Sequence, residues 1–246
     1  MRRGDRRGVT LIEVLIAITL LSALSVAMLF AMRIGLDTFG KVGDRLMLNR
    51  RVAGAQRILQ SEIEGMMPVV APCIVDGVPA GQAAPFFQGD SQTMRLVSTF
   101  SLQEAWRGRP QILEFAVIPG ENDRGVRLIV NELPYTGPQG AGQLCLGYAP
   151  SPVTGAMGPR YAPVAANPQS FVLADQLEYC RLSYLSPAMQ PGLPPAWTTR
   201  WAFNGWPMGV RIEMAPLAPD GSRLQPITAV APVRMRRNFG VPYADF

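Results

Sequence analysis

The stretch VTLIEVLIAITLLSALSVAMLFAMRI, residues 9–34, decides the fold of the N-terminal part of this 246-residue chain. Residues 14–32 carry no charged side chain, and as a helix these 19 residues would extend about 28 Å, close to the thickness of a bilayer core. The stretch therefore predicts a transmembrane helix. Glu13 lies near its start, where a carboxylate in hydrocarbon is costly unless another group pairs with it. We therefore expect a charged partner for Glu13.

Most of the net positive charge precedes this stretch. The net charge is +5, but residues 9–246 hold 19 basic and 17 acidic residues, a balance that argues against nucleic acid as a partner. The first eight residues hold four arginines, whereas only Arg33 and Lys41 follow the span closely. Because positively charged flanks stay in the cytoplasm, the pattern predicts a single-pass membrane protein with a cytoplasmic N-terminus and an extracytoplasmic C-terminal domain.

Three interpretations of this N-terminus compete. An ordinary secretory signal would be cleaved after the apolar region, near residues 23–27, and a plain signal anchor would not be cleaved. Neither accounts for Glu13, nor for a leader that stops at Gly8. Cleavage between Gly8 and Val9 accounts for both, because it creates an α-amine four residues before Glu13. That ammonium, in the same or a neighbouring chain, would pair with the Glu13 carboxylate inside the membrane.

The segment Gly8–Leu15, GVTLIEVL, resembles the class III signal of type IV pilins and of the pseudopilins of type II secretion. The usual form of that signal is the succession Gly, Phe, Thr, Leu, then either Ile or Val, then Glu. Val9 therefore stands where Phe is commoner. The resemblance implies that prepilin peptidase cleaves between Gly8 and Val9 and that Val9 is N-methylated. It also implies an assembly role for Glu13.

Beyond the span, the pattern predicts that the helix continues to residue 67, just before the first proline, Pro68. Apolar residues recur at helical spacings and predict a face that packs on the protein's own sheet: Phe39, Val42, Leu46, Val52, Leu59, Ile63 and Met66. Charged residues are expected on the opposite face: Arg45, Arg50, Arg51, Arg57, Glu62 and Glu64. The predicted divisions are a leader, 1–8, a transmembrane helix, 9–34, an amphipathic helix, 35–67, and an outer domain, 68–246.

The outer domain contains all 23 prolines, and frequent Pro and Gly separate short segments of alternating hydrophobicity. These segments predict strands at Met94–Leu102, Gln111–Ile118, Val126–Leu133, Phe171–Tyr184, Val210–Leu217 and Pro226–Arg234. The fold class is therefore α+β, a long N-terminal helix packed on antiparallel sheets. Surface connections are expected at Tyr135–Gly142 and Pro187–Pro195, and a turn at Gly120–Asp123.

The side chains give little support for catalysis. The chain has no histidine, which removes the usual general base and most transition-metal sites, so no enzyme activity, metal or cofactor is expected. Its cysteines, Cys73, Cys145 and Cys180, allow one disulfide with one thiol left over, or three buried thiols. The sequence does not identify the pair.

Later segments resemble the J-type minor pseudopilin of type II secretion. The first is Asn49–Pro68, in which Glu62 stands in place of the customary Asp. The second is Val172–Asp175, together with Tyr184, Trp197 and Trp201, and the third is Trp206–Glu213. The resemblance implies a helix with two antiparallel sheets. It further implies a place in a tip complex with I-, K- and H-type minor pseudopilins and the major pseudopilin.

The function expected from the sequence is thus a structural one, that of a minor pseudopilin that helps to start pseudopilus assembly and protein export. Alternatives are a minor type IV pilin or competence pseudopilin, and a membrane-tethered ligand-binding module using Trp197, Trp201 and Trp206. Partner and lipid contacts are expected along residues 14–55. The candidate interface residues are Ala17, Ser22, Ala23, Arg45, Arg50 and Arg51.

Overall fold

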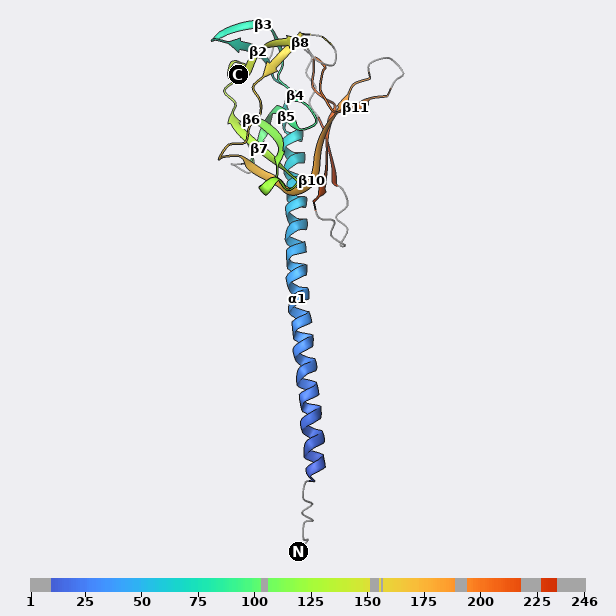
Figure 1. Cartoon of the computed structure of the whole chain (residues 1–246). Helices are drawn as coiled ribbons and strands as arrows, with labels where there is room; N and C mark the ends of the chain where they lie inside the picture. The colour runs from blue at the N-terminus through green and yellow to red at the C-terminus, as the bar shows by residue number, and fades with distance from the viewer. Residues whose placement is uncertain are drawn as a thin grey trace. The chain divides into compact units, whose positions relative to one another are not determined.

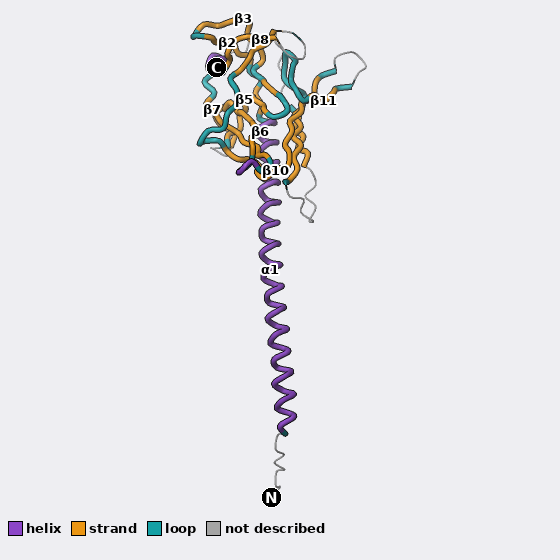
Figure 2. Tube along the Cα trace, viewed as in Figure 1, coloured by secondary structure: helices purple, strands orange, loops and turns teal. Residues whose placement is uncertain are grey.

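The computed structural model describes the backbone of residues 10–102, 106–150, 155, 157–188, 194–217 and 227–233. Within these ranges the side chains of residues 37–53, 106, 107, 227 and 229 lie outside the description. The chain forms two compact units, Met1–Arg50 and Arg51–Phe246, which we describe separately. The fold is α+β, as predicted: a long apolar N-terminal helix is followed by an antiparallel β domain (Figures 1 and 2).

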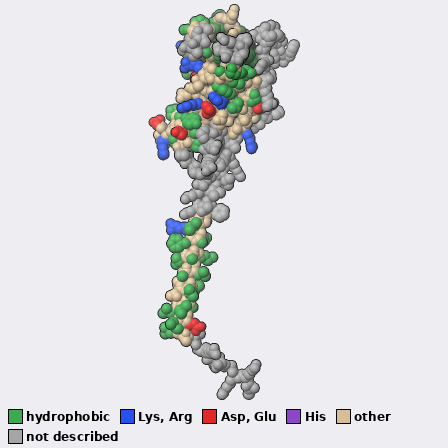
Figure 3. Space-filling model, turned by 90° about the vertical axis from the view of Figure 1, so that its right-hand side faces the viewer, with side chains coloured by type: hydrophobic (Ala, Val, Ile, Leu, Met, Phe, Trp, Pro, Cys, Tyr) green, Lys and Arg blue, Asp and Glu red, His purple; other side chains and the backbone are tan. Residues whose placement is uncertain are grey.

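Helix α1, Leu11–Glu64, provides the candidate membrane span Leu11–Leu36. The span has a mean hydropathy of 2.6, and its apolar side chains are exposed, as the visible face of this helix shows in Figure 3. The hydroxyls of its polar residues bond to the helix itself, since Ser22 Oγ donates to Ile18 O at 2.8 Å and Ser25 Oγ to Leu21 O at 2.9 Å. The helix can therefore face hydrocarbon without unsatisfied hydroxyl groups.

The C-terminal end of α1 is three residues earlier than the predicted residue 67. Gly65 N still donates to Ser61 O at 2.9 Å, but Gly65 O accepts a hydrogen bond from Thr99 N. Met66–Met67 then form strand β1, which pairs with β5. A Cβ at Gly65 would lie 2.7 Å from Ser98 Oγ, so glycine permits the close approach at which the chain leaves the helix for the sheet.

The main sheet of the β domain is antiparallel, with the order β1-β5-β6-β7-β10-β12-β13, and β4 and β11 pair with β5 and β10. All six predicted strands are present, with small boundary shifts. They are β5 Thr93–Ser101, β6 Trp106–Pro119, β7 Val126–Pro134, β10 Phe171–Ser186, β12 Gly209–Pro216 and β13 Ile227–Pro232. The predicted turn at Gly120–Asp123 is also confirmed, because a short 3-10 helix, Glu121–Asp123, joins β6 to β7 there.

Seven strands were not predicted from the sequence. They are β1, β2 Val70–Val75, β3 Val78–Pro85, β4 Gln88–Gly89, β8 Cys145–Pro150, β9 Met157–Tyr161 and β11 Ala196–Thr198. The β2–β3 hairpin nevertheless has a local signal, Asp76-Gly77 between Val75 and Val78. Both turn residues have positive φ, 51° and 78°, as a type I′ hairpin turn requires.

The two faces of the main sheet have different coverings. Alternate side chains such as Met94, Leu96 and Phe115 pack with Leu59 and Ile63 of α1. The intervening side chains on β5 and β6, Val97 and Ile112, pack on the opposite face with residues from the small hairpins β2–β3 and β8–β9. Figure 1 shows β2, β3 and β8 grouped at one end of the domain.

The connection Tyr135–Gly142 is not wholly on the surface, as the sequence had suggested. It contains helix α2, Pro138–Gly142, in which Ala141 and Gly142 are buried. A Cβ at Gly142 would lie 2.0 Å from Pro72 O, so this glycine allows α2 to lie directly on β2. In the other predicted connection, Pro187–Pro195, the described residues are exposed, and the remainder lies outside the described residues.

Candidate functional site

The predicted processing residues Gly8 and Val9 lie outside the described residues, which begin at Thr10. Thr10 O accepts hydrogen bonds from Glu13 N at 3.0 Å and from Val14 N at 3.3 Å, so α1, which starts at Leu11, begins within a few residues of the predicted cleavage point. An N-terminal amine at Val9 would be four residues before Glu13, which is about one turn of a helix. This spacing is compatible with the charge pairing inferred from the sequence.

Glu13 is in the first turn of α1, where the helix dipole favours a negative charge. With Val14, Ala17, Ile18 and Leu21 it lines a shallow groove of about 290 Å³ along the helix. Among the described residues, none donates a hydrogen bond or ion pair to its carboxylate. The pairing predicted from the sequence, with the N-terminal amine or with a group of another chain, therefore stays a prediction.

The small candidate interface residues do not share one face of α1. At 100° per residue, Ser22 lies about 140° and Ala23 about 240° around the helix from Ala17. Each side chain is exposed, so close approach of another helix is possible from several directions rather than along a single stripe. The side chains of Arg45, Arg50 and Arg51 lie outside the described residues.

Glu62 is the main correction to the predicted amphipathic pattern. It was expected on the polar face with Glu64, but its exposed fraction is 0% and its carboxylate oxygens have no hydrogen-bond partner among the described residues. A helical-wheel position would have indicated this, because residue 62 lies only about 20° from Ala55 around the helix, and Ala55 is buried. Burial raises the pKa of the Glu62 carboxyl well above its ordinary value, and the nearby Glu132 carboxylate raises this pKa further.

The raised pKa predicts that Glu62 makes folding pH-dependent. Its neutral form fits the fold, so its stabilising effect is complete below the unfolded-state pKa of about 4.3 and is lost as pH rises towards the native pKa, by at most about 1.4 kcal/mol per pH unit. The Glu62→Gln variant should lack this decline. Urea denaturation of the full-length protein in detergent, from pH 4 to pH 8, measures the effect.

The matched control is Glu178→Gln, which removes a carboxyl from an exposed position of β10. It should retain the pH dependence of the wild-type protein. Equal pH profiles for the wild-type protein and Glu62→Gln would contradict the burial of an unpaired carboxyl at this position.

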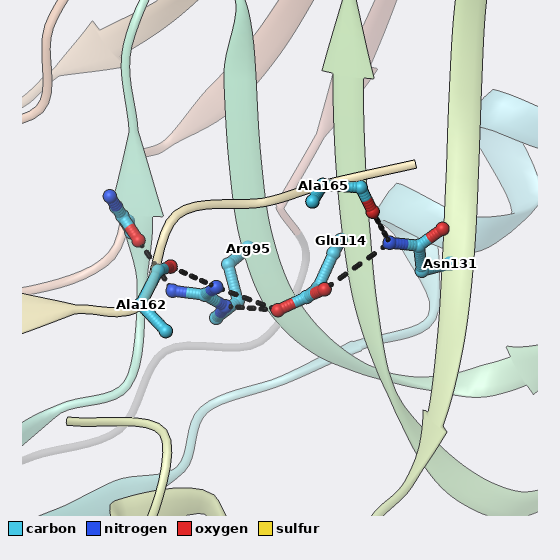
Figure 4. Close-up of polar contacts among 6 residues, drawn as sticks. Arg95, Glu114, Asn131, Ala162 and Ala165 are labelled. Carbon is cyan, nitrogen blue, oxygen red and sulfur yellow. Dashed lines mark hydrogen bonds and ion pairs between the residues drawn. The ribbon is translucent and has the colours of Figure 1, made fainter. Parts of the chain in front are cut away.

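A network of buried polar side chains joins three neighbouring strands, β5, β6 and β7, on the sheet face opposite α1 (Figure 4). Arg95 Nε donates to Glu114 Oε1 at 2.8 Å, and Asn131 Nδ2 is 3.4 Å from Glu114 Oε2. Arg95 Nη2 also donates to Ala162 O at 2.7 Å, and Asn131 Nδ2 to Ala165 O at 2.9 Å. The network therefore holds the segment after β9 against the sheet.

Of the arrangements that the sequence left open, the structure has one disulfide, Cys73–Cys145, which joins β2 to β8. Cys180 is a free thiol in β10, and its burial raises its pKa to about 12. An unreactive thiol is expected at such a pKa. The disulfide links the two small hairpins, β2–β3 and β8–β9, to each other.

The β domain has a surface cleft of about 630 Å³. Its lining comes from β3, β4, β8, β9 and residues 200–204. Of the three tryptophans considered for ligand binding, Trp201 lines the cleft but Trp197 and Trp206 do not. Trp197 instead stacks beneath Arg211, whose guanidinium carbon is 4.6 Å from the ring centroid. The three rings therefore do not form one platform.

The family model of the prokaryotic N-terminal methylation motif matches residues 3–29. No curated protein matches the chain. The single apolar N-terminal helix suggests membrane anchoring of a C-terminal globular domain. The methylation motif indicates, more specifically, a prepilin-type protein related to type IV pilins, and it implies processing by prepilin peptidase and pilus-like assembly with other pilins.

Proposed function

We propose that this chain is a minor pseudopilin of a type II secretion system that joins the pseudopilus tip and helps to initiate its assembly. The observation that carries the proposal is the combination of the methylation motif, including Glu13, with a helix that continues from the apolar span into a β domain. The role is structural, with the domain in the periplasm. Its partners would be I-, K- and H-type minor pseudopilins and the major pseudopilin.

The buried contacts of Leu59 and Ile63 support this role. They fix the C-terminal part of α1 to the sheet, so the domain and the helix that carries it form a continuous unit from Arg51 onward. The chain's three aromatic candidates for ligand binding do not converge, which favours an assembly subunit over a Trp-based binding module.

The first test is removal of residues 1–8. Coexpression with prepilin peptidase should yield a mature protein that begins with N-methylated Val9, whereas Gly8→Val should remain full length because a bulkier residue does not fit beside the scissile bond. Mass spectrometry of the intact protein measures both. An unprocessed wild-type chain, or one cleaved near residue 26, would rule out the prepilin assignment.

The second test concerns assembly through Glu13. Glu13→Ala should be inserted and cleaved normally, but should copurify with its partner pseudopilins at least about tenfold less than wild type, because a buried ammonium loses its counter-charge. Ser25→Ala is the matched control, since it removes a hydroxyl that bonds only within the helix. Wild-type recovery of I- and K-type subunits with Glu13→Ala would argue against the pairing.

Membership of the secretion machinery is tested by the identity of the partners. Coexpressed I- and K-type pseudopilins should copurify with the mature full-length chain in detergent. If only the minor pilins of a type IV pilus copurify, the chain belongs to a pilus system instead.

A further inference from the structure

The 630 Å³ cleft of the β domain has a chemistry that the assembly role does not use. Arg160 and Arg200 line it with exposed side chains, and no ion pair involves either of them among the described residues. Asp90 is the one acidic residue in its lining, and its oxygens already accept hydrogen bonds from Gln92 N, Thr93 N and Thr93 Oγ1 at 2.6–2.8 Å. The cleft is therefore positively charged and complementary to an anion.

An aromatic group forms the apolar part of the same cleft. Trp201 lies with its ring centroid 4.9 Å from that of Phe203 and 5.9 Å from that of Phe87. Its position is fixed by two hydrogen bonds, because Trp201 N donates to Gly89 O at 2.8 Å and Nε1 to Gly205 O at 2.9 Å. A prearranged apolar surface thus lies beside the two arginines, which favours a ligand with both acidic and apolar groups.

The backbone of the cleft is suited to a peptide. In the described sheets β9 pairs with β8 alone and β3 with β2 alone, so each strand has one edge without a strand partner. Residues 81–83 of β3 also fall in a register irregularity opposite β2, between the pairs Cys73↔Ala80 and Ala71↔Ala84. Both strands contribute residues to the cleft, and Gln82 O of β3 already accepts a hydrogen bond from Tyr148 Oη. The remaining groups on an open strand edge can hydrogen-bond an extended chain.

We propose that this cleft binds an extended acidic peptide segment of another protein, with its carboxylates on Arg160 and Arg200 and an apolar side chain against Trp201 and Phe203. The binding is separate from the pairing of Glu13 in the membrane, so it can be measured whether or not the chain assembles into a pseudopilus. The two arginines would determine the preference for acidic sequences, and the strand edges would select an extended backbone.

The experiment uses the full-length protein in detergent and the rhodamine-labelled hexapeptide SEFELE, with fluorescence polarisation as the readout. Arg160→Gln and Arg200→Gln should each weaken binding about tenfold, as expected for loss of a charge-assisted hydrogen bond. Arg124→Gln, at an exposed position outside the cleft, is the matched control and should bind like wild type. The lysine peptide SKFKLK and a backbone N-methylated SEFELE should bind at least tenfold more weakly than SEFELE.

Several outcomes would overturn the proposal. They are absence of SEFELE binding, equal binding of SKFKLK, and equal affinity in the Arg160→Gln and Arg124→Gln variants. If glutarate binds as tightly as the peptide, or the N-methylated peptide binds normally, the cleft is a small-anion site and not a peptide site. Phe203→Ala separates the apolar contribution to binding from the contribution of the arginine charges. It should weaken SEFELE binding but leave the salt dependence of the affinity unchanged.

Discussion

Replacement of Arg95 by Met should lower the free energy of unfolding by about 3–5 kcal/mol, because it leaves the Glu114 carboxylate buried without its ion-pair partner. The side chain of Arg95 is 1% exposed and that of Glu114 is 9% exposed, so water cannot replace the guanidinium easily. The substitution also removes the donors to Gln88 Oε1 and Ala162 O. Urea denaturation of full-length protein in detergent, followed by tryptophan fluorescence, measures the change.

Arg127→Met on β7 is the matched control for Arg95→Met. Arg127 lies 3.4 Å from Glu121 and 3.7 Å from Asp175, whose side chains are 79% and 40% exposed, and each pair with such an exposed partner contributes only about 0–1 kcal/mol. Hydrogen exchange adds a local readout, because loss of the Arg95–Ala162 bond should accelerate exchange of the residues after β9. An equal loss of stability in the two variants would show that the buried network has no special role.

The double substitution Cys73→Ser/Cys145→Ser should lower the free energy of unfolding by about 4 kcal/mol, within the usual range of about 2–5 kcal/mol for a lost native disulfide. The effect is large because the bond joins residues 72 positions apart, so it restricts a long segment of the unfolded chain. Thermal and urea unfolding under non-reducing conditions measure it, and reduction of the wild-type protein should reproduce most of the loss.

Cys180→Ala is the control for the disulfide substitution. It removes a buried sulfur from the main core without changing the cross-link, so it should cost less than the double substitution. In the folded wild-type protein, a thiol reagent should label Cys180 only after denaturation, because burial raises its pKa to about 12. Rapid labelling of two or three thiols in the native protein would contradict the Cys73–Cys145 assignment.

The six long strands could be predicted because their side chains alternate over enough residues to show a period of two. The small hairpins could not be read in the same way. Strand β9, Met157–Tyr161, has the sequence MGPRY, which shows no alternation, and it is paired only through β8. Such strands depend on packing against the rest of the domain rather than on their own β-propensity.

The N-terminal methylation motif, which includes Glu13, could also be inferred locally, since it lies within one continuous segment. Cleavage between Gly8 and Val9 stays a prediction. The cleft could not be inferred locally, because its arginines, Arg160 and Arg200, and its aromatic residues come from segments separated by other strands. The burial of Glu62 could be predicted only in part. Its angular position beside Ala55 was present in the sequence, but the depth of its burial depends on the sheet that covers α1.

The sequence by itself determined the candidate membrane span, the N-terminal motif, the α+β class and the long strands, because each depends on charge or periodicity within a continuous segment. Tertiary structure alone decided that Cys73 bonds to Cys145, that Arg95, Glu114 and Asn131 are neighbours, and that the buried Glu62 carboxylate has no hydrogen-bond partner among the described residues. The physical reason is that strand order and register bring together residues far apart in the chain. The free energies of their contacts and desolvation depend on that arrangement, which local patterns do not encode.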